Sequence, residues 1–182
     1  MGIKWFMTAI LFGIISPAFA QQFLTKNGEV VFLSQASLSE FEGKSRSLQG
    51  LIDYDKNLLD FYLDLNTLDT GIGLRDKHMR ENYLETDEFP FAEFTGKLSA
   101  LAKPTPGQVQ QVTAEGKFKL HGVEREVRVK GSLTPQANGS MVLEAKFSIL
   151  LSDYQIEIPK LVFYELAPEQ QVSIKATLTP KK

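Results

Sequence analysis

The sequence contains no cysteine and only two histidines, His78 and His121. Without cysteine, the chain can form neither a disulfide framework nor a lipid-anchored N-terminal cysteine. The two histidines lie far apart, and neither has a second ligand at the spacing of a known metal motif. The sequence also lacks a Gly-x-Ser-x-Gly elbow and a glycine-rich phosphate loop. These absences argue against a serine hydrolase, a metal centre and a nucleotide site.

The chain has no excess of basic residues, because 20 Lys and Arg stand against 22 Asp and Glu, giving a formal net charge of −2. Proteins that bind nucleic acid usually carry a basic surface, so no nucleic-acid partner is expected. The 182 residues are 43% hydrophobic and 23% charged, an ordinary composition for a globular protein. This length predicts one domain with a sizeable core.

The first twenty residues have the pattern of a secretory signal peptide. The apolar run Trp5 to Ile15 is shorter than the ~20 residues that a membrane-spanning helix needs, so processing is favoured over a retained anchor. Small residues at Ala18 and Ala20 form a signal-peptidase site. We therefore expect cleavage after Ala20 and a mature domain of residues 21–182, periplasmic or secreted, without an integral membrane span.

Short segments of alternating apolar and polar residues fill most of the mature chain, which is typical of an antiparallel barrel or sandwich. A first short strand is expected to end at a Lys26-Asn27-Gly28 turn and to be followed by a strand at Glu29–Ser34. Gln35–Glu42 is expected to be a loop or one helical turn. Lys160–Leu166 is compatible with a short helix or an irregular loop. The remaining strands are expected at Arg46–Tyr54, Leu58–Leu65, Phe91–Ala102, Gln108–Leu120, Val123–Leu133, Met141–Leu151 and Val172–Leu178.

One segment, Thr70–Phe94, interrupts this alternation with helical spacing. Leu74, His78 and Met79 share one side of the expected helix at about residues 72–82, and Pro90 returns the chain to an extended conformation. The opposite side is charged, and its residues are expected to form ion pairs that hold the helix on the barrel rim or, alternatively, to lie near a polar ligand headgroup. The residues concerned are Arg75, Asp76 and Glu81.

The same segment carries a family signature, RD-x-HM-R-E-x-YL-E-x-D-x-FP-x-x-x-F, from Arg75 to Phe94. Further matches follow in order at Gly116–Val123, Phe147–Ile149 and Asp153–Ile156. Together these motifs resemble those of the YceI-like proteins. The resemblance implies an all-β fold, an antiparallel, lipocalin-like β-barrel of about eight strands with one short helix at the rim. It also implies a periplasmic protein that binds a polyisoprenoid.

The expected inner face of the barrel is apolar and contains several small residues: Gly50, Gly96, Ala114, Gly116, Gly131, Ala145 and Ala176. Small side chains either leave a ligand cavity or allow strands to bend sharply in a filled barrel, and the pattern alone leaves both interpretations open. If there is a cavity, Gly116→Leu and Ala145→Phe should fill it without disturbing the fold. The expected ligand-contacting residues are Ile52, Phe61, Leu63, Leu74, Met79, Phe94, Phe118, Val127, Val129, Phe147, Ile149 and Ile174.

These observations predict a non-catalytic, exported binding protein that holds a polyisoprenoid, an isoprenoid quinone or another lipid, with no other cofactor. A ligand-free structural or stress-protective protein is the alternative. An enzyme is disfavoured, because Arg125 is the one ionisable residue expected on the inner face. The sequence leaves open whether the protein forms a homodimer.

Overall fold

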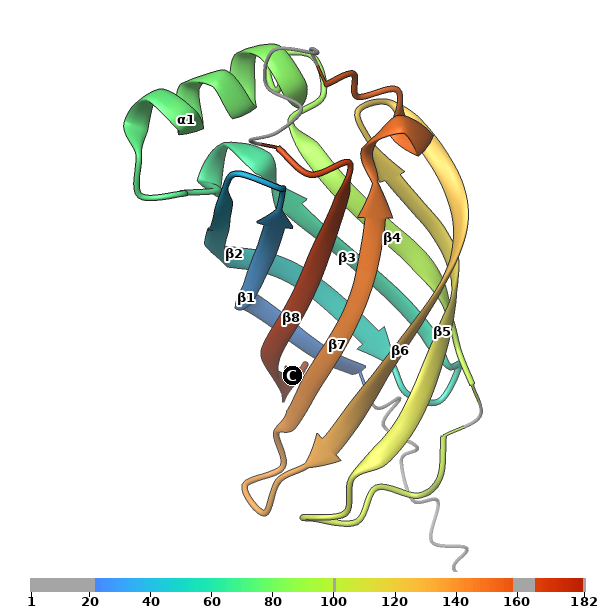
Figure 1. Ribbon diagram of the computed structural model, residues 1–182. Helices are drawn as coiled ribbons and strands as arrows, with labels where there is room; N and C mark the ends of the chain where they lie inside the picture. The colour runs from blue at the N-terminus through green and yellow to red at the C-terminus, as the bar shows by residue number, and fades with distance from the viewer. Residues whose placement is uncertain (1–21, 100, 159–165, 182) are drawn as a thin grey trace, which may run out of the picture.

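Eight antiparallel strands form a closed barrel in the computed structural model, which describes residues 22–99, 101–158 and 166–181. Each strand pairs with the next one in the chain, and β8 closes the barrel against β1 (Figure 1). The predicted fold class is therefore confirmed. The signal peptide and nearly all of Lys160–Leu166 lie outside the described residues. The strands are β1 (Gln22–Gln35), β2 (Glu40–Asp53), β3 (Leu58–Asp64), β4 (Phe91–Leu98), β5 (Gln110–Leu120), β6 (Val123–Pro135), β7 (Met141–Leu150) and β8 (Glu169–Pro180).

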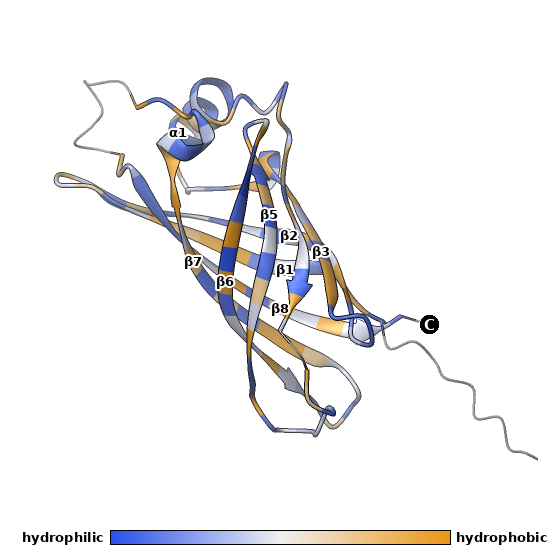
Figure 2. Cartoon of the chain, turned by 90° about the vertical axis from the view of Figure 1, so that its right-hand side faces the viewer, coloured by the Kyte–Doolittle hydropathy of each residue, from blue (hydrophilic) through white to orange (hydrophobic). Residues whose placement is uncertain are grey.

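Alternation along the strands directs every second side chain into the barrel. In β3, Leu59, Phe61 and Leu63 are buried, whereas Asp60 and Tyr62 between them are exposed. Figure 2 shows the same change between hydrophobic and hydrophilic residues along the other strands. The core therefore lies inside the barrel, and the outer face is mostly polar, with a few exposed apolar side chains such as Leu58, Phe91 and Leu150.

The expected Lys26-Asn27-Gly28 turn is wrong, because β1 is one continuous strand through these residues. Thr25 pairs with Gly50 and Gly28 pairs with Leu48, so three steps along β1 match two steps along β2. The extra residue forms a bulge, which bends a strand without ending it. The Asn-Gly sequence therefore marks a bend here and not a hairpin.

The first hairpin is also tighter than expected. Residues 36–39 connect β1 to β2, and the Ala36 amide donates to the Ser39 carbonyl at 2.9 Å. The strand that was expected to begin at Arg46 begins at Glu40. Residues 40–42, assigned above to a loop or a helical turn, are consequently paired with the end of β1.

A short helix follows β3 and lies over one end of the barrel (Figure 1). It consists of α1 (Gly73–His78) and a π-helical turn (Met79–Tyr83), close to the predicted span. Two backbone hydrogen bonds between Lys44 and Asp69, of 2.8 and 2.9 Å, attach the segment before α1 to β2. We call this end of the barrel the helix end and the opposite end the closed end.

Glycines hold two neighbouring strands unusually close. A Cβ atom on Gly116 would lie 2.1 Å from the Thr95 carbonyl oxygen, and one on Gly96 would lie 2.5 Å from the Glu115 carbonyl oxygen. These two glycines face each other across β4 and β5. The expectation that Gly116→Leu would fill a cavity is therefore wrong, because the added atoms would collide with the backbone of the neighbouring strand.

Candidate functional site: an apolar cavity in the barrel

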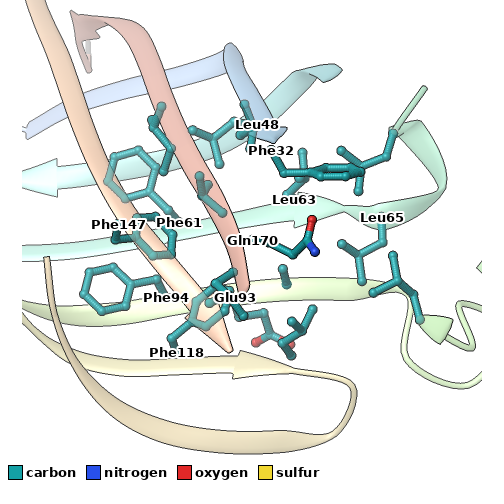
Figure 3. Close-up of a pocket in the computed structure, with 18 of the residues that line it drawn as sticks. Phe32, Leu48, Phe61, Leu63, Leu65, Glu93, Phe94, Phe118, Phe147 and Gln170 are labelled. Carbon is teal, nitrogen blue, oxygen red and sulfur yellow. The ribbon is translucent and has the colours of Figure 1, made fainter. Parts of the chain in front are cut away.

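A cavity of about 540 Å³ occupies the barrel beneath α1. Strands from around the whole barrel contribute to its wall, and most of the lining side chains are apolar (Figure 3). Its volume lies within the ~300–1,000 Å³ range of small-molecule sites. Ala114 and Ala145 line this hollow, which supports the cavity interpretation for these two small residues. Gly131 also lines it, but a Cβ atom there would lie 2.6 Å from the Glu144 carbonyl oxygen, so its small size serves the close approach of two strands.

All twelve residues expected to contact a ligand line this cavity; their contact with a ligand stays a prediction. They are Ile52, Phe61, Leu63, Leu74, Met79, Phe94, Phe118, Val127, Val129, Phe147, Ile149 and Ile174. Eleven of them are buried or half-buried, whereas Leu74 on α1 is 64% exposed. Because Leu74 both lines the cavity and meets solvent, the cavity reaches the surface at the helix end.

Aromatic rings form one side of the wall. Phe118 makes edge-to-face contacts with Phe147, at a centroid distance of 5.8 Å, and with Tyr154, at 5.5 Å. Such contacts hold rings in fixed positions against one another. The rings therefore stand along the wall beside the cavity, where Figure 3 shows Phe118 and Phe147 among the lining side chains.

The closed end is filled by large side chains. Leu133 and Leu178 are completely buried and Met141 is 1% exposed, and none of the three lines the cavity. Beside them, the Tyr54 hydroxyl donates to the Ala102 carbonyl at 2.6 Å, and its ring contacts Phe23 at a centroid distance of 6.1 Å. The cavity is therefore a pocket with a floor, and its exposed lining lies at the helix end.

The charged side of α1 makes different contacts from those expected. The Arg75 guanidinium lies 4.2 Å from the centroid of the Phe41 ring, a cation–π contact at the mouth of the cavity. The Asp76 carboxylate accepts hydrogen bonds from the Thr70 amide and hydroxyl, at 2.8 and 2.6 Å. Glu81 forms a long ion pair with Lys77, at 4.0 Å, and both side chains are exposed. Of the three residues expected to form ion pairs, Glu81 forms one, with Lys77 of the same helix, whereas no ion pair of Arg75 or Asp76 is found among the described residues.

Two opposing effects set the pKa of Asp76. Burial raises it, but hydrogen bonds from Thr70 and the positive charge of Arg80 outweigh burial, so the pKa is lowered from its ordinary value. The carboxylate is consequently ionised at neutral pH. It fixes the backbone that leads into α1 and so helps to position the mouth of the cavity.

The chain after α1 is fastened to the neighbouring hairpin by His121. Its Nε2 atom lies 2.7 Å from Glu85 Oε2, and its Nδ1 atom lies 3.0 Å from the Tyr154 carbonyl oxygen. His121 is in the β5–β6 turn with a φ of 50°, followed by Gly122 with a φ of 71°. His121 therefore lies in the connection between the strands expected at Gln108–Leu120 and Val123–Leu133, and it joins three segments at the helix end.

A second, smaller hollow of about 270 Å³ lies where β6 and β7 separate. The two strands pair only from Lys130 and Lys146 to Pro135 and Met141, at the closed end. Beyond that region β6 pairs only with β5, and β7 only with β8. The hollow shares part of its wall with the main cavity, namely Phe118, Val127, Val129, Phe147 and Ile149.

Sequence reasoning missed several polar residues of the wall, and Gln170 is the most deeply buried of them. It shares the inner face of β8 with Val172 and Ile174, but β8 begins at Glu169, three residues before its expected start. Extending the alternation backward by two residues would have found it. Arg125, the one ionisable residue expected inside, is exposed at the rim, and its Nε donates to the Asp153 carbonyl at 3.0 Å.

Fold and cavity together define a lipocalin-like antiparallel barrel with an apolar interior. The profile of the YceI-like domain matches residues 22–179, so the chain belongs to the YceI-like family. No protein of curated function matches the chain significantly. Within the described ranges, no helix has the length and apolar character needed to cross a membrane.

Solved structures share this fold at low sequence identity. A polyisoprenoid binding domain from Saccharophagus degradans is 20% identical, with a TM-score of 0.78 over 88% of this chain and 98% of that one. BcnA from Burkholderia cenocepacia is 18% identical, with a TM-score of 0.67 over 84% and 96%. The YCEI protein of Campylobacter jejuni is 14% identical, with a TM-score of 0.63 over 81% and 89%.

Proposed function

We propose that this protein is an exported, non-catalytic carrier that holds one long apolar ligand, a polyisoprenoid or isoprenoid quinone, in its barrel. The cavity of about 540 Å³ carries the proposal, because its predominantly apolar wall offers a chain molecule a large surface removed from water. Burial of apolar surface contributes about 25 cal/mol per Å². The name of the similar Saccharophagus degradans domain supports a polyisoprenoid over other lipids.

The chemistry of the wall supports binding without catalysis. The ionisable side chains that line the cavity include Arg75 and His78 at its mouth and Glu93, which pairs with Lys119 at 3.4 Å and is half-exposed. A catalytic site needs acid, base or nucleophile groups that converge within hydrogen-bond reach. The described part of the wall provides mainly apolar contacts, and its ionisable side chains lie at the mouth or are half-exposed.

Native mass spectrometry of the protein purified from its own host tests the carrier proposal. We expect a complex heavier than the polypeptide, and organic extraction should release a long apolar molecule. The Ala145→Phe variant is the matched control, because its added ring would occupy the cavity beside Gly131. A mass equal to the polypeptide alone, in the parent as in the variant, would favour the ligand-free structural alternative.

Export is proposed from the sequence of residues 1–20 alone. N-terminal sequencing of the exported protein should begin at Gln21, directly after the Ala18-x-Ala20 site. Recovery of the full-length chain in the membrane fraction would contradict this part of the proposal. The carrier activity would then have to operate from a membrane-attached protein.

A further inference from the structure

One polar side chain lies deep in the apolar wall. Gln170, on β8, is 6% exposed and lines the cavity. The other polar residues of the described wall are exposed or half-buried, and several of them lie at the mouth. Figure 3 shows the Gln170 side chain among the apolar residues that surround the pocket. A buried amide in such a wall needs a physical explanation, because unpaired polar groups destabilise a protein interior.

The orientation of this amide is fixed by its neighbours. Gln170 Nε2 donates to the Ala167 carbonyl oxygen at 2.6 Å and to Ser34 Oγ at 3.3 Å. A carbonyl oxygen can only accept a hydrogen bond, so the nitrogen must be the atom that faces Ala167. Ser34 Oγ also accepts from the Ala167 amide at 3.0 Å. The network therefore uses the nitrogen of Gln170 and leaves its oxygen free for another donor.

No donor among the described residues reaches Gln170 Oε1, which is buried. Only one other buried side-chain atom in the described part of the chain shares this condition, Thr25 Oγ1, and Thr25 does not line the cavity. An amide oxygen accepts hydrogen bonds and cannot donate them. A partner for this oxygen would have to be a donor, and because Gln170 lines the cavity, a ligand there can supply one.

We propose that Gln170 Oε1 accepts a hydrogen bond from a hydroxyl group of the bound ligand, so that the cavity selects long apolar alcohols or phenols. This inference rests on the proposed carrier function and narrows its ligands to those with a hydroxyl group, such as a polyisoprenoid alcohol or the reduced, quinol form of an isoprenoid quinone. Gln170 pairs with Ser34 and Ile149, near the ends of β1 and β7 at the helix end. The hydroxyl would therefore lie below the mouth, with the apolar chain extending toward the floor.

The proposal excludes ligands whose polar end only accepts hydrogen bonds. An oxidised quinone, an ester or a methyl ether would place a second acceptor against Gln170 Oε1 and leave both oxygens without a donor. A prenyl alcohol and a prenylated phenol both present an O–H group, so they share the required chemistry. Comparing each with its own methyl ether distinguishes these two sources of the hydroxyl.

The test measures dissociation constants of geranylgeraniol and its methyl ether, and of a prenylated phenol and its methyl ether. In the parent protein we expect each hydroxyl compound to bind about three- to tenfold more tightly than its ether, the range of one neutral hydrogen bond. The source with the larger ratio is the better match to the site. In Gln170→Met both ratios should fall to about one.

Each ratio compares the dissociation constants of two ligands for the same variant, so it does not depend on how the substitution affects folding. Such an effect is expected, because Gln170→Met also removes the hydrogen bond to Ala167. Ile174→Val, on the same face of β8, is the matched control and should weaken both members of a pair equally. A preference that persists in Gln170→Met would reflect the size of the ether methyl group and would overturn the proposal. Equal binding of alcohol and ether by the parent would also overturn it, while leaving the carrier function intact. Binding of none of the four compounds would overturn both.

Discussion

The two ends of the barrel are built from the same alternating pattern but are packed differently. At the closed end Leu133, Met141 and Leu178 meet and fill the interior, whereas at the helix end the side chains stand along the wall around a cavity. The pairing of β6 with β7 changes along the same axis, because these strands are joined at the closed end and separate toward the helix end. Alternation thus determines which side chains point inward, and strand spacing determines whether they meet.

The largest expected difference between the ends is the stability cost of the same substitution. Leu133→Ala should lower the free energy of unfolding by about 3–5 kcal/mol, because it opens a void in a filled region. Leu63→Ala, in the cavity wall, should cost about 2 kcal/mol, since fewer contacts are lost beside an existing hollow. Urea unfolding of the two variants measures both values. Equal costs would show that the helix end is as tightly filled as the closed end.

The second comparison is between two small residues with different roles: Gly116, which lies between closely spaced strands, and Ala145, which lines the cavity. Gly116→Ala should lower stability by about 1–3 kcal/mol or more, because its Cβ would lie 2.1 Å from the Thr95 carbonyl oxygen. Ala145→Phe should change stability less and weaken long-chain binding by at least about tenfold, because it fills space that the ligand needs. Thermal melts and titrations check the two variants side by side. A stable Gly116→Ala protein would contradict the close approach of β4 and β5.

A third prediction concerns Asp76, which acts only at the helix end. Its pKa is lowered in the folded protein, so its stabilising effect is present above the unfolded value of about 3.9 and is lost as the pH falls below it. Asp76→Asn should cost about 1 kcal/mol at pH 7 and show no such loss in acid. Protection factors of the α1 amides, measured by hydrogen exchange at pH 6 and at about pH 3, follow the local effect, because only the lower pH lies below the unfolded value. Protection factors at the closed end should change less than those of α1.

The smallest effect is expected where β6 and β7 separate. Lys130 and Lys146 are directly opposite each other at this point, and like charges across strands destabilise a sheet. Lys146→Glu should therefore stabilise the barrel by about 0.2–1 kcal/mol, and Lys146→Gln by less. Urea unfolding at low and high salt tests this, because salt should reduce the gain. A loss of stability in Lys146→Glu would mean that repulsion does not act at this site.

Much of the barrel was predictable from residues that alternate without interruption. The inward set of β3 and the inward Phe118 and Phe147 follow from that pattern, since a strand side chain has only two faces to choose from. The helical spacing within Thr70–Phe94 also placed the helix close to its observed span. These predictions depend on local geometry alone, and for that reason they hold.

The predictions that failed depend on contacts between distant segments. The bulge at Lys26-Asn27-Gly28 is set by pairing with β2, and the role of Gly116 is set by the neighbouring backbone of β4. Arg75 contacts Phe41, a partner that helical spacing cannot reveal. Gln170 was missed because β8 begins at Glu169, three residues before the start expected from the alternating residues Val172–Leu178. The end of a strand is the least reliable part of a sequence prediction.

The central claim is that the helix end binds one long apolar chain through the area that it removes from water. The most direct measurement is a titration of the protein with isoprenoid alcohols of increasing chain length. The affinity should rise with each added unit, at about 25 cal/mol per Å² of buried apolar surface, and then level off when the cavity of about 540 Å³ is full. An affinity that does not depend on chain length, in a protein whose thermal stability the ligands leave unchanged, would contradict the claim.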